Sequence, residues 1–155
     1  MSAQPTERDV LLQYLNKNRQ AVVVKTMGLA EEQLRAPGVP SGTNMLGIVH
    51  HLAGVEAHWF GFVFLGEHVD CDMAMVAPPE LTASEVIGSY RAACRVSDEI
   101  VRAYDDLSTL AAMVNPGENE LDSLRVILAH MIEETARHAG QADILRELID
   151  GHVEE

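Results

Sequence analysis

Two side chains that can bind a metal lie one helical turn apart near the end of the chain. Glu134 and His138 stand four residues apart inside the apolar, helix-periodic segment 130–148, so on a helix they project from the same face. A carboxylate or an imidazole that points into a core is costly to bury without a partner. A bound divalent cation would satisfy both groups, and we therefore predict a metal site here.

A second segment supplies a candidate third ligand. Apolar residues between positions 43 and 65 recur at i, i+3, i+4 and i+7, which predicts a helix with one core-facing side. At about 100° per residue, His51 falls on the shoulder of this apolar stripe, whereas His50 falls nearly opposite it. We expect His51, Glu134 and His138 to form a three-ligand site that leaves positions open for water or a ligand.

The same residues also have a purely structural interpretation. A Glu–His pair at i and i+4 stabilises a helix by itself, by roughly 0.2–0.5 kcal/mol. The chain has seven histidines; of these we expect His50 and His68 to face solvent and His130 to lie at the boundary. Asp143 and Arg146 are most simply part of a solvated face. The third group, the imidazole of His51, comes from a different helix and favours the metal interpretation.

Long amphipathic helices must position these residues. The helices are predicted at 6–27, from 43 or 44 to 65, at 82–107 and from 122 or 123 to 149, with a short helical turn at 30–34. Capping boxes at Thr6–Asp9 and Thr82–Glu85 begin two of them, and Gly151 ends the last. Residues 16–19 are predicted to form the solvent-facing side of the first helix. The pattern contains no convincing strand, and the connections of moderate length are typical of an all-α four-helix bundle.

Composition and charge exclude several classes of partner. The chain has 155 residues, 47% apolar and 23% charged, which favours a single globular domain over 1–155. The formal charge of −13 argues against binding to nucleic acid or to an anionic membrane surface. Cys71 and Cys94 form no metal-like pair, and residues 2–10 do not read as a signal peptide, so we expect a reduced, cytoplasmic compartment.

Two segments together resemble a known family. Residues 45–60, MLGIVHHLAGVEAHWF, and residues 130–147, HMIEETARHAGQADILRE, are similar to the DinB-like superfamily, and the similarity covers nearly the whole chain. It is strongest to the actinobacterial branch related to mycothiol-dependent maleylpyruvate isomerase and to thiol transferases. The resemblance implies a DinB/YfiT-like four-helix bundle of the up-down-down-up type, and a homodimer.

The resemblance also implies a ligand set. In that superfamily, a histidine on the second helix and a His/Glu-x-x-x-His pair on the last long helix bind a divalent metal. The matching positions here are His51, Glu134 and His138, and we expect zinc, with nickel as the alternative. In the resemblance, many close relatives have a histidine where Gln141 stands, so the role of this residue is left open. Neither cysteine is placed as a nucleophile, so a low-molecular-weight thiol would supply the reacting sulfur.

Three functions are compatible with these residues. The first is a metal-dependent S-transferase or detoxification enzyme, whose substrates are a small-molecule thiol of the mycothiol type and an electrophile. The second is a metal-dependent hydrolase that uses bound water, which would need a further general base. The third is a non-catalytic stress or ligand-binding bundle, whose metal is structural or absent. The resemblance favours the first, because a cation lowers the pKa of a thiol that binds to it.

Overall fold

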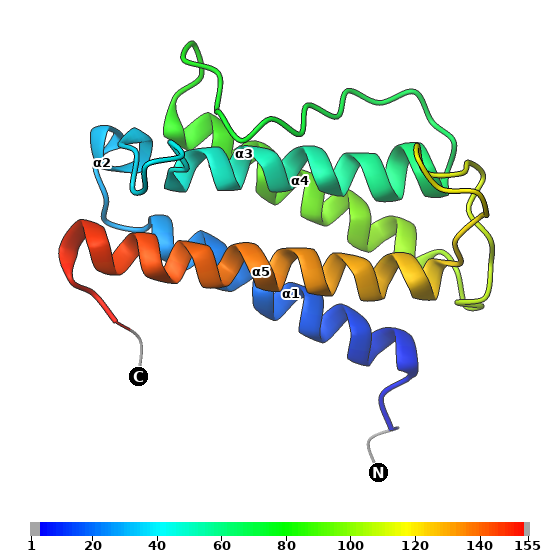
Figure 1. Ribbon diagram of the computed structural model, residues 1–155. Coiled ribbons are helices and arrows are strands. Elements are labelled where there is room, and N and C mark those ends of the chain that lie inside the picture. Colours follow the sequence, from blue (N-terminus) through cyan, green and yellow to red (C-terminus); the bar gives the residue numbers. More distant parts are fainter. Residues whose placement is uncertain (1–3, 154–155) are drawn as a thin grey trace.

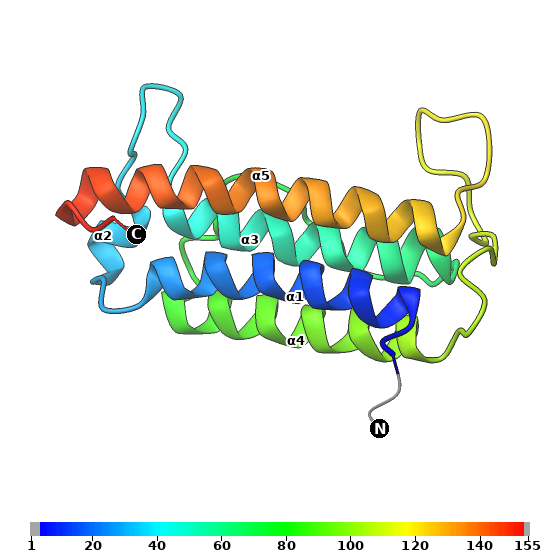
Figure 2. The ribbon, with the colours of Figure 1, turned by 90° about the horizontal axis from the view of Figure 1, so that it is seen from below.

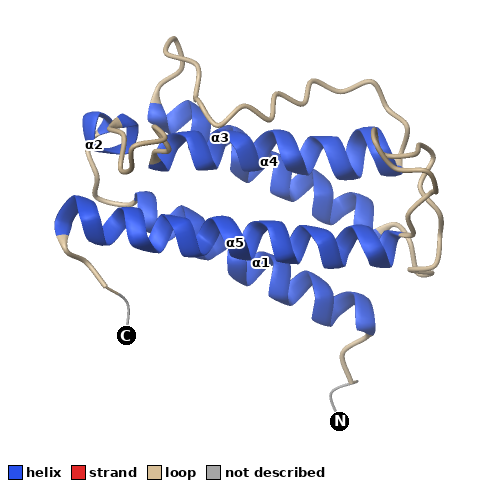
Figure 3. Cartoon of the chain, in the orientation of Figure 1, coloured by secondary structure: helices blue, strands red, loops and turns tan. Residues whose placement is uncertain are grey.

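A computed structural model describes residues 4–153 of the protein, and over this range the chain is all-helical, as predicted (Figure 3). The helices are α1 (Glu7–Thr26), α2 (Glu31–Arg35), α3 (Met45–Glu56), the π-helix η1 (Ala57–Phe64), α4 (Ala83–Arg102) and α5 (Leu124–Asp150). Across this described range, no helix is long and apolar enough to cross a membrane. Residues 1–3 and 154–155, on which the signal-peptide and domain predictions partly rest, lie outside the described residues.

The four long helices form the predicted bundle with the order up, down, down, up. α1 and α5 run in one direction, whereas α3, continued by η1, and α4 run in the other (Figures 1 and 2). α1 packs mainly against α5, and α3 packs mainly against α4. Because α3 and α4 are parallel, the chain must return along the length of α3 before α4 begins. Residues 65–82, hereafter the strap, make this return (Figure 1).

Most of the long helices begin or end at the capping residues predicted from the sequence. Thr6 and Thr82 form the predicted capping boxes, with Asp9 and Glu85 as their partners. Ser123 caps α5, which ends at Gly151 in the left-handed conformation with φ 73°. These local hydrogen bonds satisfy the free N–H and C=O groups that every helix end leaves.

Two long helices differ in part from their predictions. The helix expected at 82–107 ends at Arg102. Beyond it, the carboxylate of Asp106 accepts the backbone N–H and the hydroxyl of Ser108, which favours a turn where the last helical residues were expected. The helix that ends near residue 65 is α-helical only to Glu56 and then continues as a π-helix, which is wider and has i→i+5 hydrogen bonds. A pattern of apolar residues does not distinguish these two types of helix.

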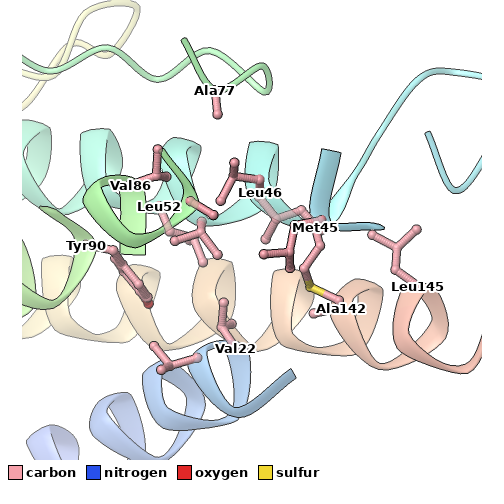
Figure 4. Close-up of a cluster of buried hydrophobic side chains, with 14 of the residues drawn as sticks. Val22, Met45, Leu46, Leu52, Ala77, Val86, Tyr90, Ala142 and Leu145 are labelled. Carbon is pink, nitrogen blue, oxygen red and sulfur yellow. The ribbon is translucent and has the colours of Figure 1, made fainter. Parts of the chain in front are cut away.

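The core consists of two apolar clusters, one toward each end of the bundle. The first, shown in Figure 4, includes Val22, Met45, Leu46, Leu52, Ala77, Val86, Tyr90, Ala142 and Leu145. The second includes Leu12, Leu15, Val55, Trp59, Phe60, Val101, Leu124, Ile127, Leu128 and Met131. Members of both clusters come from α1, α3, α4 and α5, so each cluster holds all four long helices together.

Arg19 corrects the prediction that residues 16–19 face solvent. Its guanidinium donates two 2.7 Å hydrogen bonds to the carboxylate of Glu56 and one of 2.6 Å to Asp98. Only 4% of the Arg19 side chain and 1% of the Glu56 side chain are exposed. α1 contacts α3 and α4 as well as α5. The polar side of α1 that was expected to face solvent is therefore partly covered by other helices.

The predicted solvated face of α5 is also partly covered. Arg146 is largely buried and donates to the carbonyl oxygens of Lys25 and Met27, at 3.0 and 2.7 Å. It therefore satisfies carbonyl groups at the C-terminal end of α1. Asp143 remains half-exposed, as predicted, and forms a 3.1 Å ion pair with the buried Lys25.

Candidate metal centre

The structure brings together the three residues predicted as ligands. His51 comes from the middle of α3, and Glu134 and His138 come from successive turns of α5, which faces α3. The Oε1 atom of Glu134 lies 3.2 Å from Nε2 of His51 and 3.0 Å from Nε2 of His138. One ligand atom from each of the three side chains lies within 4.8 Å of the other two.

These separations are compatible with one metal ion. Zinc binds nitrogen and oxygen at about 2.0–2.2 Å, so two ligand atoms of a tetrahedral site lie about 3.3 Å apart. The two distances from Oε1 of Glu134 are close to this value. His138 is buried, whereas His51 and Glu134 are half-buried. The centre is therefore mostly covered by protein, but solvent still reaches part of it.

The outer nitrogen of each imidazole faces a hydrogen-bond acceptor. Nδ1 of His51 lies 2.7 Å from the carbonyl oxygen of Met73 in the strap, and Nδ1 of His138 lies 2.8 Å from Oε1 of Gln141. A carbonyl oxygen can only accept, so Nδ1 of each ring carries a proton, and in the neutral imidazole Nε2 then presents its lone pair toward Glu134. Histidines that bind metals usually donate their second N–H to such an acceptor. Gln141, whose role the sequence left open, is thus an acceptor for His138.

The charge at the centre favours a cation. Burial raises the pKa of Glu134, but the hydrogen bond with His51 and the attraction of His138 outweigh burial, and the pKa lies below its ordinary value of 4.5. Glu134 is therefore ionised at neutral pH. When both imidazoles are neutral, their two Nε2 lone pairs and the carboxylate oxygen repel one another unless a proton or a metal ion lies between them.

The neighbouring His50 does not belong to the centre, but it does not face solvent either. Its Nε2 atom lies 3.1 Å from Oδ2 of Asp72, and the side chain is largely covered. The prediction was wrong because the strap lies over α3 and supplies this partner. His68, which was also expected to face solvent, is exposed.

Two further histidines line the bundle beyond the centre. His58 is buried two turns after His51, and its Nε2 atom lies 2.9 Å from Oδ1 of Asn115. His130 is half-buried against the ring of Trp59, with ring centroids 4.5 Å apart, which agrees with the predicted boundary position. Neither residue joins His51 in the group of potential ligands found among residues 4–153.

The half-buried Cys94 does not carry a reactive thiolate. Burial and the negative charge of Glu56 raise the pKa of the Cys94 thiol to about 12. Cys94 is thus a protonated thiol at neutral pH, and its Sγ atom lies 3.9 Å from Oε1 of Glu56. The other free cysteine, Cys71, lies in the strap. Reactive cysteines need the opposite environment, one that lowers the pKa.

A comparison with protein families identifies the family of the chain. The model of one family, described as mycothiol-S-transferase, matches residues 10–151. The chain belongs to the mycothiol-S-transferase family. This family is a member of the DinB-like superfamily, so the resemblance seen in the sequence is confirmed. The region that matches the mycothiol-S-transferase family includes all three candidate ligands and Gln141. No curated protein matches the chain.

Proposed function

We propose that the protein is a divalent-metal-dependent S-transferase that joins a low-molecular-weight thiol of the mycothiol type to an electrophile. Membership of the mycothiol-S-transferase family supports the thiol and the class of reaction. The arrangement of the two imidazoles supports the metal. The observation that carries the proposal is that both Nδ1 atoms have acceptors, at 2.7 and 2.8 Å, while both Nε2 atoms face Glu134.

His51, Glu134 and His138 would hold the metal. Two nitrogens and one carboxylate oxygen suit zinc, with nickel as the alternative, and three protein ligands leave a position open for a substrate. When bound, the cation lowers the pKa of a thiol at that position and keeps the sulfur as a thiolate. Met73 and Gln141 keep the imidazole rings oriented, because each accepts the Nδ1 proton of one ring.

The reaction that follows is a substitution by sulfur. The thiolate attacks an electrophilic carbon and a C–S bond forms, while the bond to the leaving group breaks and its electron pair departs with that group. The proton of the thiol passes to solvent. The sulfur comes from the cosubstrate, because the Cys94 thiol stays protonated. In this scheme the three ligands bind and orient, and none of them acts as the nucleophile.

Metal analysis tests the first part of the proposal. Protein purified without a nickel column is analysed for zinc and nickel, and we expect one metal ion per chain. His138→Ala should lose the metal, whereas His68→Ala, in which an exposed histidine is removed, should retain it. An absence of bound metal in the unaltered protein, even after incubation with zinc, would overturn the metal-dependent function.

A thiol-consumption assay tests the second part. The protein is mixed with mycothiol and monochlorobimane, which becomes fluorescent when a thiol displaces its chloride. We expect product formation that stops when a chelator removes the metal and resumes when zinc is added back. If the metal is bound but thiol consumption does not depend on it, the transferase function is wrong, and metal-dependent hydrolysis or ligand binding takes its place.

We also propose that the protein forms a homodimer in the cytoplasm. Support for the dimer is the exposure of apolar side chains on α5, where Ile144 and Leu148 are 60% and 61% exposed. Support for the cytoplasm is that both cysteines are free, as in a reducing compartment. Light scattering after size-exclusion chromatography should give twice the mass of one chain, and the mass of a single chain would refute the dimer.

A further inference from the structure

Three glycines at seven-residue intervals lie beneath the strap. They are Gly47 and Gly54 on α3 and Gly61 on η1. A methyl group at Gly54 would overlap the carbonyl oxygen of Asp72 and lie 2.6 Å from its carbonyl carbon. A methyl group at Gly47 would overlap the carbonyl oxygen of Met75 and lie 2.9 Å from its carbon. The strap backbone therefore rests directly on the backbone of α3, which only glycine permits.

The third contact is of a different kind. A methyl group at Gly61 would lie 3.2 Å from Cγ1 of Val69, which is a side-chain atom rather than backbone. A small rotation of that valine would relieve the contact. The strap is thus fixed closely at two points and loosely at a third, and the two close points enclose the segment 72–75.

The enclosed segment contains the acceptor of a candidate ligand. Gly47 precedes His51 by four residues and Gly54 follows it by three, so all three lie on neighbouring sides of α3. Between the contacts at Asp72 and Met75, the carbonyl oxygen of Met73 lies 2.7 Å from Nδ1 of His51. A strap held farther from the helix would not reach this nitrogen.

A side chain holds the same segment from its other side. Oδ1 of Asp72 accepts the N–H of Ala74 at 3.0 Å, and Oδ2 lies 3.1 Å from Nε2 of His50. Asp72 therefore fixes the turn that contains Met73 and ties it to α3. The two consecutive histidines of α3 thus have different functions: His50 anchors the strap through Asp72, and His51 donates its Nδ1 proton to the Met73 carbonyl oxygen.

We infer that Gly47, Gly54 and Asp72 are positioning residues for the metal centre. They bring the strap close enough for the Met73 carbonyl group to hold the Nδ1 proton of His51 and to turn Nε2 toward Glu134. This inference rests on the proposed metal site. The close contact between the strap and α3 thereby has a function of its own. A looser connection of the same length would also join the two parallel helices.

Zinc affinity tests the inference, measured by competition with a chromophoric chelator. Gly54→Ala and Gly47→Ala should bind zinc about 10–100-fold more weakly than the unaltered protein, which is the usual effect of removing the partner of a ligand. Gly61→Ala should stay within about twofold, and so should Gly88→Ala on α4, where a methyl group meets no atom within 4 Å. Met73→Ala should also stay within about twofold, because the backbone carbonyl group is retained.

A spectroscopic measurement separates positioning from general loss of stability. In zinc-loaded protein with ¹⁵N-labelled histidine, the Nδ1 proton of His51 should be protected from exchange with water. Gly54→Ala should lose this protection while the helical circular dichroism is retained. Asp72→Ala changes a half-exposed side chain and should fold. It therefore replaces Gly54→Ala in this test if the glycine variant does not fold. Asp72→Ala should weaken zinc binding at least threefold.

The outcomes are distinguishable. If the unaltered protein binds no zinc, the proposed function fails and this inference fails with it. If the unaltered protein binds zinc and Gly54→Ala or Asp72→Ala binds it equally well, the positioning role alone is wrong. If Gly61→Ala weakens binding as much as Gly54→Ala, the strap acts only through its overall packing, and the specific role of the segment 72–75 is refuted.

Discussion

Removal of Arg19 should be among the most destabilising single changes on α1. Arg19→Met takes away the cation that Glu56 and Asp98 share, and it leaves Glu56, 1% exposed, without its two 2.7 Å hydrogen bonds. Breaking a buried ion pair by removing one partner costs about 3–5 kcal/mol. We expect a value within this range, because the buried Glu56 loses both hydrogen bonds to Arg19, whereas Asp98 keeps its contacts with Asn16 and Arg102.

The chain contains a matched pair at the surface. Arg125 donates two hydrogen bonds to Glu7, at 2.8 and 3.1 Å, but the two side chains are 47% and 55% exposed. Both pairs join an arginine and a glutamate through two hydrogen bonds, so they differ mainly in burial. An exposed pair contributes about 0–1 kcal/mol. Arg125→Met should therefore lower the free energy of unfolding much less than Arg19→Met does.

Urea unfolding at neutral pH, followed by circular dichroism, measures both changes. The double variant Arg19→Met/Glu56→Met should recover part of the lost stability, because replacing both partners of a buried pair with apolar side chains is often close to neutral. The reasoning fails if Arg19→Met costs no more than Arg125→Met. It also fails if the double variant is less stable than Arg19→Met.

Three further predictions concern the metal centre and the thiols. Gln141→Leu removes the acceptor of His138 and should weaken zinc binding about 10–100-fold in chelator competition; equal affinity would contradict the hydrogen-bond role. The pKa of Glu134 is lowered from 4.5, so its ionised form stabilises the metal-free fold above that pH, and this contribution is lost as the pH falls through the lowered pKa. Urea midpoints of the unaltered protein and Glu134→Gln should therefore converge from pH 6 to pH 3, and a constant difference would refute this. Cys94, with a pKa of about 12, should react with iodoacetamide at least tenfold more slowly than free cysteine at pH 8, as followed by mass spectrometry, and an equal rate would contradict its burial beside Glu56.

The group of candidate ligands was predictable because it depends on simple periodicity. A spacing of four residues places Glu134 and His138 on one face of any α-helix. The angle of His51 relative to the apolar stripe separated it correctly from its neighbour His50, which pairs with Asp72 instead. That these residues bind a metal stays a prediction, since their convergence is also compatible with hydrogen bonds among them alone.

The features that the sequence did not predict depend on more than one helix. Arg19 lies on a polar run of α1, and its burial follows from the packing of α1 against both α3 and α4. A signal was nevertheless present, because Glu56 is the only Asp, Glu, Lys or Arg between positions 43 and 65. A lone acid in such an apolar helix requires a cation from elsewhere. Periodicity alone does not show which cationic side chain pairs with Glu56.

These polar contacts fix α3 on several sides. His51 and Glu56 lie five residues apart, about 140° around the helix, so one reaches Glu134 of α5 while the other reaches Arg19 of α1. The strap covers a third side, where Gly54 allows close approach. Apolar packing tolerates small rotations of a helix, whereas hydrogen bonds in three directions do not. The orientation of His51 is therefore set by the whole bundle, and changes far from the centre, such as Arg19→Met, should weaken zinc binding even where the protein still folds.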